Sequence, residues 1–168
     1  SVDGVFQLSN QDTLYVQSMH STSEYPQLIQ GRYSQESNLS DDAHVLEYTH
    51  FDRRWDWRAQ YFDYGEDFRA DLGFVNRVDY KKIVTTVGHT WRWSDDNFFS
   101  RIRFAADYDR TEDQSGLQLE EETEFFINMD GPLQSFYNGL FGGSETYWNG
   151  KYFDEQFNQV SIGFSPTP

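Results

Sequence analysis

Apolar and polar residues alternate with period two along much of this chain. From Ile83 to Trp93 the odd-numbered positions are mostly apolar, and after a turn at 94–97 the even-numbered positions from Phe98 to Tyr108 are mostly apolar. Such alternation predicts amphipathic strands, each with one apolar and one polar face. Strands of this length can separate an apolar from an aqueous environment. Whether the apolar environment is a bilayer or a protein core decides the function.

Two predicted hairpins bring their rings to one shared face. The first, within residues 44–64, places His50 opposite Trp55. The second places Trp93 opposite Phe98. Pairs of rings across neighbouring strands stabilise a sheet and select its register. The predicted aromatic face carries Trp55, Trp57, Trp91, Trp93, Phe98, Phe104 and Tyr108.

The opposite face of the same strands is charged. It carries Arg58, Arg101, Arg103, Glu120, Glu122 and Glu124. The expected cross-strand ion pairs are Glu47 with Arg58, Lys82 with Asp109 and Arg103 with Glu124. Glu121 is the exception to the pattern, because its position in the 117–129 strand places it on the apolar side.

The remaining alternation and turn residues extend this pattern over the whole chain. We expect strands at 5–8, 14–19, 28–33, 44–51, 54–64, 83–93, 98–108, 117–129, 133–141, 145–153 and 156–164, with loops at 21–26 and 34–42. The sequence therefore predicts an all-β fold of up to about ten strands. We expect an antiparallel up-and-down meander that forms all or part of a β-barrel, within a single domain, 1–168, or a fragment of one.

Composition narrows the class of protein. Aromatic residues make up 18% of the chain and hydrophobic residues 37%, which favours pleated, half-buried surfaces over a helical core. No apolar run approaches the roughly 18 residues of a membrane helix. A net charge of −15 argues against a nucleic-acid partner, and the lack of cysteine excludes disulfides and thiolate chemistry. The start without Met and the end beyond the last strand lead us to expect a segment of something longer.

An irregular inter-strand loop is expected at 65–80. Phe68 and Phe74 are predicted to anchor it, Gly73 allows an unusual backbone angle, and Arg77 is placed to pair with Asp79 or Asp71. We interpret this segment as a structural loop that closes or shapes one mouth of a barrel.

The same segment carries a resemblance to a known family. Phe68, Gly73, Phe74, Val75, Arg77 and Asp79, preceded by a tyrosine–glycine pair and by Trp-x-Trp in the strand before, match its pattern. The chain resembles an uncharacterised bacterial family with an N-terminal carbohydrate-binding domain of the family-nine type and a C-terminal outer-membrane β-barrel region. The resemblance covers roughly residues 40–165 and implies that this chain is part of the barrel region. The sugar-binding domain has no counterpart here, so no carbohydrate role is carried over.

Five tryptophans suggest three different roles. Those near hairpin ends fit the aromatic girdle of a membrane barrel, an ordinary core, or a platform for stacking sugars. Trp148, beside Asn149-Gly150 in a turn-like context, is the better candidate for glycan binding.

The acidic residues invite a catalytic interpretation, which spacing does not favour. Glu120, Glu122 and Glu124 form a row along one strand face rather than the isolated pair of carboxylates that a glycoside hydrolase needs. The four dispersed histidines show no zinc-binding spacing. We expect no catalytic residues, no cofactor and no metal.

These patterns favour a non-enzymatic segment of a Gram-negative outer-membrane β-barrel. It would be a scaffold or pore associated with uptake or display, in contact with the lipid bilayer and assembled with further copies or with the rest of a larger chain. The alternative is a soluble periplasmic or extracellular β-barrel or sandwich that binds a ligand such as a glycan. Glu121 and His89 on the apolar face favour the alternative, since a polar group facing lipid is costly.

Overall fold

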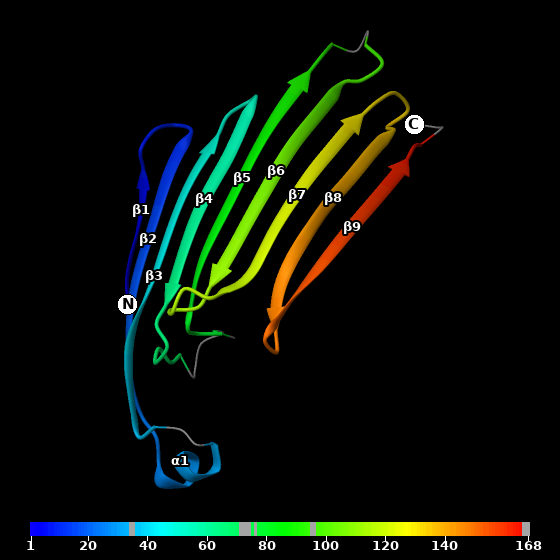
Figure 1. The fold of residues 1–168 in the computed structure, drawn as a ribbon. Helices are drawn as coiled ribbons and strands as arrows, with labels where there is room; N and C mark the ends of the chain where they lie inside the picture. The colour runs from blue at the N-terminus through cyan, green and yellow to red at the C-terminus, as the bar shows by residue number, and fades with distance from the viewer. Residues whose placement is uncertain (34–35, 71–74, 76, 95–96, 166–168) are drawn as a thin grey trace.

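The protein folds as one layer of antiparallel strands. The computed structural model describes residues 1–33, 36–70, 75, 77–94 and 97–165. Nine strands lie side by side in chain order, and β1 and β9 are the two edges of a curved, open sheet (Figure 1). The predicted all-β antiparallel meander is thus confirmed, and the sheet is not closed into a barrel. The strands are β1 (Val2–Gln7), β2 (Asp12–Glu24), β3 (Asn38–Phe51), β4 (Trp55–Tyr64), β5 (Tyr80–Arg92), β6 (Arg101–Glu112), β7 (Gln118–Asp130), β8 (Phe136–Trp148) and β9 (Lys151–Gly163).

The strand predicted at 28–33 is wrong, because the chain forms a helix there. Helix α1 spans Gln27–Tyr33 and follows Pro26, whose carbonyl accepts hydrogen bonds from the N–H groups of Ile29 and Gln30. Proline suits the start of a helix because its fixed φ is already helical. A short apolar run does not distinguish a strand from a helical turn, and this one contains no alternation that would decide.

The loops predicted at 21–26 and 34–42 are shorter than expected. β2 continues to Glu24 and pairs there with Asn38, the first residue of β3. Serine, threonine and acidic side chains therefore occupy regular strand positions, and the β2–β3 hairpin extends below the rest of the sheet to α1 (Figure 1). Polarity alone did not indicate a loop.

The three strands predicted after residue 132 are two long ones. β8 and β9 meet at Asn149-Gly150, where both residues have positive φ, 49° and 81°. Two residues of this kind form the turn that suits the twist of a hairpin. Gly142, expected in a turn, lies within β8, where an added Cβ would come within 2.6 Å of the Phe157 ring. The glycine therefore serves close packing between strands rather than a turn.

Both predicted hairpin registers are displaced by two residues, while the faces stay the same. His50 pairs with Trp57 rather than with Trp55. His89 pairs with Phe104, and Trp93 donates a backbone hydrogen bond to Ser100 rather than facing Phe98. Each turn lies one residue further along the chain than expected. Since side chains alternate with period two, a displacement of two leaves every side chain on its predicted face.

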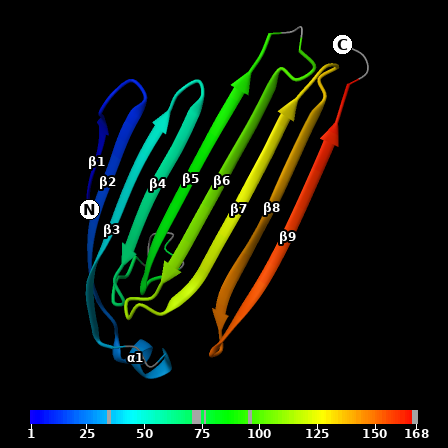
Figure 2. The same cartoon turned by 45° about the horizontal axis from the view of Figure 1, so that its top comes forward.

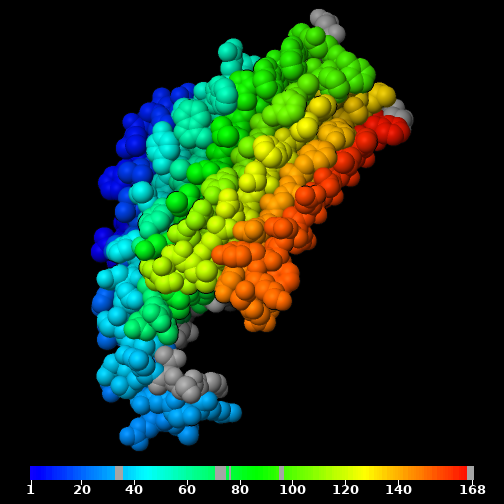
Figure 3. Space-filling model, in the orientation of Figure 1, coloured from blue at the N-terminus to red at the C-terminus, as the bar shows by residue number. Residues whose placement is uncertain are grey.

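Little of the sheet is buried. The buried apolar residues are Leu39, Ala43, Val45, Phe68 and Ala105, and the first three lie in β3. A second view shows the same single curved layer (Figure 2). On the face seen in the space-filling view, no second layer of described residues covers the strands (Figure 3).

The β8–β9 turn provides a test of this fold. Gly150→Ala should lower the free energy of unfolding by about 1 kcal/mol, because a Cβ is strained at a φ of 81°. Gly31→Ala, in α1 with no neighbour within 4 Å of the added Cβ, should leave stability unchanged or raise it. Urea denaturation followed by circular dichroism measures both. Equal effects of the two substitutions on the free energy of unfolding would contradict the positive φ of Gly150 in this turn.

Candidate functional site

The apolar face of the sheet is the more exposed of the two. Along β5, Ile83, Val87 and Trp91 on this face are 46%, 45% and 42% exposed. Gly88 and Thr90, on the opposite face of the same strand, are buried. The polar face is therefore the more enclosed side of the curved sheet.

Rings pack against one another across the apolar face. His89 lies between Trp55 and Trp91, with ring centroids 4.2 Å and 4.3 Å away, and Trp91 meets Phe104 edge-on at 5.7 Å. Trp57 stacks on His50 at 3.9 Å on the neighbouring pair of strands. The result is a continuous aromatic surface from β3 to β6.

The other predicted members of the aromatic face lie at its borders. Trp93 and Phe98 fall outside the strands at the upper end of the sheet, where Phe98 contacts Phe99 edge-on at 5.0 Å. Tyr108 lies further down β6, opposite Thr123 of β7.

The apolar area crosses the sheet obliquely. In one row of paired residues, apolar side chains on β4 and β5 give way to charged ones from β6 onward: Tyr61, Ile83, Arg110, Glu121, Glu145 and Asp154. In a higher row, polar side chains on β2 and β3 give way to apolar ones: Asp12, His50, Trp57, Val87, Ala106 and Phe125. We call this oblique area the apolar band.

Glu121 lies at the lower border of the apolar band rather than among the rings. It lies opposite Arg110 in the β6–β7 register, and its carboxylate accepts a hydrogen bond from the Tyr108 hydroxyl at 3.2 Å. Its neighbour on β8 is Glu145. The carboxylate therefore belongs to a charged border.

An ion pair crosses the enclosed polar face above a glycine. The Arg103 guanidinium on β6 binds the Asp56 carboxylate on β4 at 2.5 Å, passing over Gly88 of the strand between them. An added Cβ at Gly88 would collide with both side chains. Because Gly88 has no side chain, the ion pair can lie directly above it. Arg101, also on this face, binds Asp130 at 2.6 Å.

The observed registers change the predicted ion pairs, since β3–β4 is displaced by two residues and β6–β7 by four from the pairing expected. Arg103 lies opposite Asn128, so the expected pair with Glu124 is wrong. The expected pair of Glu47 with Arg58 is also wrong. Glu47 lies opposite Gln60 and accepts a hydrogen bond from its amide, and Arg58 lies opposite Thr49. The pair of Lys82 with Asp109 is present at 2.6 Å, although these residues are diagonal rather than opposite.

Carboxylates gather on the lower half of the polar face. Glu120, Glu122 and Glu124 face Thr111, Asp109 and Asp107 of β6. Arginine side chains dominate the upper half of the same face, at Arg58, Arg92, Arg101 and Arg103. Carboxylates are therefore concentrated in the lower half of the enclosed face, while Asp56 and Asp130 in the upper half are bound by Arg103 and Arg101.

The segment after β4 packs onto the lower end of the polar face. Phe68 is 3% exposed and meets the Tyr64 ring edge-on at 5.7 Å. The backbone N–H of Asp67 donates to the Asp41 carboxylate, and that of Arg69 donates to the Ser21 hydroxyl. These contacts hold the segment against β2 and β3.

The other residues of this predicted loop have different roles. Asp79, at a φ of 61°, accepts a hydrogen bond from the backbone N–H of Gln114. Among the described residues no ion pair joins Arg77 to Asp79. Gly73 and Phe74 lie outside the described residues.

Trp148, the glycan candidate, is the last residue of β8. Its side chain is 68% exposed and it pairs with Lys151 across the turn. Next to it, Tyr147 and Tyr152 have ring centroids 5.1 Å apart.

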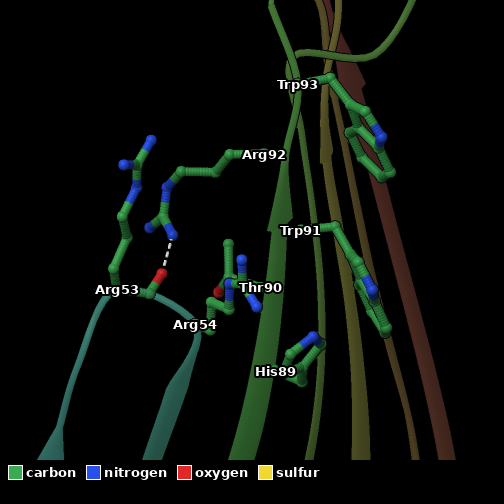
Figure 4. A pocket seen from close by; sticks show the side chains of 7 residues that line it. All are labelled: Arg53, Arg54, His89, Thr90, Trp91, Arg92 and Trp93. Carbon is green, nitrogen blue, oxygen red and sulfur yellow. Dashed lines mark hydrogen bonds between the residues drawn. The ribbon is translucent and has the colours of Figure 1, made fainter.

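A group of arginines at the upper end of the sheet was not predicted from the sequence. Arg53 and Arg54 in the β3–β4 turn and Arg92 on β5 line a depression of about 450 Å³ together with His89, Thr90, Trp91 and Trp93 (Figure 4). Arg92 donates a hydrogen bond to the Arg53 carbonyl. The neighbouring Arg53 and Arg54 in the predicted turn were the available sequence signal for this group. The β4–β5 register, which brings Arg92 beside them, could not be read from the sequence.

The space at Gly88 provides a test of the polar face. A double-mutant cycle between Arg103 and Asp56 should give a coupling of about 1 kcal/mol, which Gly88→Ala should abolish by displacing both side chains. The coupling between Arg110 and Glu112, on the other face, is the matched control and should not change. A coupling of Arg103 with Asp56 that survives Gly88→Ala contradicts the geometry.

Comparison with known proteins adds no relative. The chain matches no family model, no curated protein and no solved structure. The described helix is too short and too polar to cross a membrane. Among the described residues, no group of three or more histidine or acidic side chains is arranged to hold a metal ion. The family resemblance suggested by the 67–80 segment stays a prediction.

Proposed function

We propose that this chain is a segment of an outer-membrane β-barrel, with the aromatic face toward lipid and the charged face toward a polar interior. One observation carries the proposal: the apolar face is the exposed side of the sheet and the charged face the enclosed side. In water this arrangement leaves a large apolar surface uncovered, whereas a bilayer covers it.

The strands have the length that this role requires. β5 has 13 residues, more than the roughly 9–11 that a tilted strand needs to cross a bilayer. The aromatic rings near the upper strand ends, among them Trp55 and Trp91, match the girdle of such barrels at the membrane interface. The ion pairs of the opposite face match a solvated interior.

The oblique course of the apolar band is a further argument. On β4 the lowest apolar residue of the band is Tyr61, and on β9 it is Val160. Val160 lies in the same row of paired residues as Trp55, which is six residues from Tyr61 along β4. In a barrel with strands tilted by roughly 40° and spaced about 4.8 Å apart, a level border moves by about one residue per strand. The border here moves by about six residues over about five steps, as that tilt requires.

The proposed role is therefore a non-enzymatic scaffold or pore in the outer membrane of a Gram-negative bacterium. Its open edges, β1 and β9, would pair with further strands. Association with carbohydrate uptake or display rests on the family resemblance alone.

The alternative, a soluble ligand- or glycan-binding module whose apolar face is covered by protein, has one observation in its favour. His89 lies in the middle of the apolar face, and its Nδ1 is buried with no hydrogen-bond partner among the described residues. A polar ring nitrogen facing lipid carries a cost.

Tryptophan fluorescence in brominated lipid separates the two. A variant that retains only Trp57, with the other four tryptophans replaced by Phe, should be strongly quenched in bilayers with brominated acyl chains, because Trp57 lies within the apolar band. A variant that retains only Trp148 is the matched control and should be quenched little, since Trp148 is at a strand end on the opposite face. Circular dichroism confirms that each variant is folded. Trp57 emission that brominated chains leave unchanged would overturn the proposal.

A further inference from the structure

The arginines at the upper end of the sheet differ from the three arginines and one lysine that bind carboxylates elsewhere in the described residues. Arg101, Arg103, Arg110 and Lys82 each bind a carboxylate within 2.6 Å. Among the described residues, none of the three arginines of the depression, Arg53, Arg54 and Arg92, belongs to an ion pair. The chain has 28 acidic and only 13 basic side chains, so carboxylates are abundant. Three neighbouring arginines without a carboxylate partner leave a local positive charge that a ligand can bind.

The backbone around this group is held in place. The Asp52 carboxylate accepts hydrogen bonds from the N–H groups of Arg54 and Trp55, which fixes the turn. The backbone N–H of Thr90 donates to the Arg54 carbonyl at 2.7 Å, and Arg92 holds the Arg53 carbonyl. The bases of the three side chains are therefore fixed relative to one another before a ligand arrives, which lowers the entropic cost of binding.

The side chains point to the polar side of the sheet. Figure 4 shows Arg53, Arg54 and Arg92 together on one side of β5, while Trp91 and Trp93 project on the other. A ligand bound by the arginines would thus lie at the upper end of the enclosed face, in a depression whose wall also includes Trp91 and Trp93.

We infer that Arg53, Arg54 and Arg92 form a binding site for a multivalent, phosphate-bearing anion. Guanidinium groups bind phosphate through paired, charge-assisted hydrogen bonds, and three of them around a depression of about 450 Å³ suit a ligand of more than one negative charge. The position on the polar side favours a free phosphate compound over a lipid headgroup. The inference stands whether the aromatic face meets lipid or protein.

Isothermal titration with pyrophosphate at low ionic strength tests the site on the folded chain, in a non-ionic detergent if the chain requires one. A second titration uses vesicles of phosphatidylglycerol, which present the same chemistry as a headgroup. Arg53→Gln and Arg92→Gln should each weaken pyrophosphate binding at least about tenfold. Arg110→Gln, which removes a paired arginine of the other face, is the matched control and should leave binding unchanged.

Arg53 lies at the turn and its side chain makes no described contact, so Arg53→Gln tests the site even if the Arg92 variant fails to fold. Dependence on Arg53 and Arg92 with pyrophosphate supports the site and a free ligand. The same dependence with vesicles alone supports the site and assigns it to a headgroup. Absence of saturable binding in both titrations, or equal loss in the Arg110 variant, would overturn the inference.

Discussion

Backbone hydrogen bonds between neighbouring strands are the interaction on which this structure depends. Eight strand pairings join nine strands in one layer, and only a few apolar side chains are buried. A two-layer domain gains most of its stability from side chains packed between its layers. Here that contribution is small, and one face of the sheet leaves large apolar side chains exposed. The ladder also leaves β1 and β9 as the two edges of the sheet.

The enclosed face shows how side chains adapt to that ladder. Because neighbouring strands are only about 4.8 Å apart, a side chain reaches across one strand if the residue below is small. The Arg103–Asp56 pair does so above Gly88, and this links β4, β5 and β6 by side chains as well as by backbone. At the lower end, Phe68 and the segment around it close the space beside β3.

Much of this architecture could be predicted from the alternation of apolar and polar residues, since odd- and even-numbered residues of a strand lie on opposite faces of the sheet. The faces of Trp57, Arg103 and their neighbours followed from sequence alone, and survived a register error of two residues in both hairpins. The register itself could not be predicted, because it depends on where each turn lies, and no favoured turn residues mark the β3–β4 turn. The ion partners and the arginine depression depend on register, so they could not be predicted either. Helix α1 was missed because its seven residues are too few to show a helical periodicity.

Folding with and without an apolar phase is the most direct test of the central claim. The purified chain, refolded in aqueous buffer and in parallel into detergent micelles or bilayers, can be compared by far-ultraviolet circular dichroism and by gel mobility before and after boiling. The account predicts strand-rich, heat-modifiable protein only in micelles or bilayers. A stable, monomeric, strand-rich protein in buffer alone would contradict it.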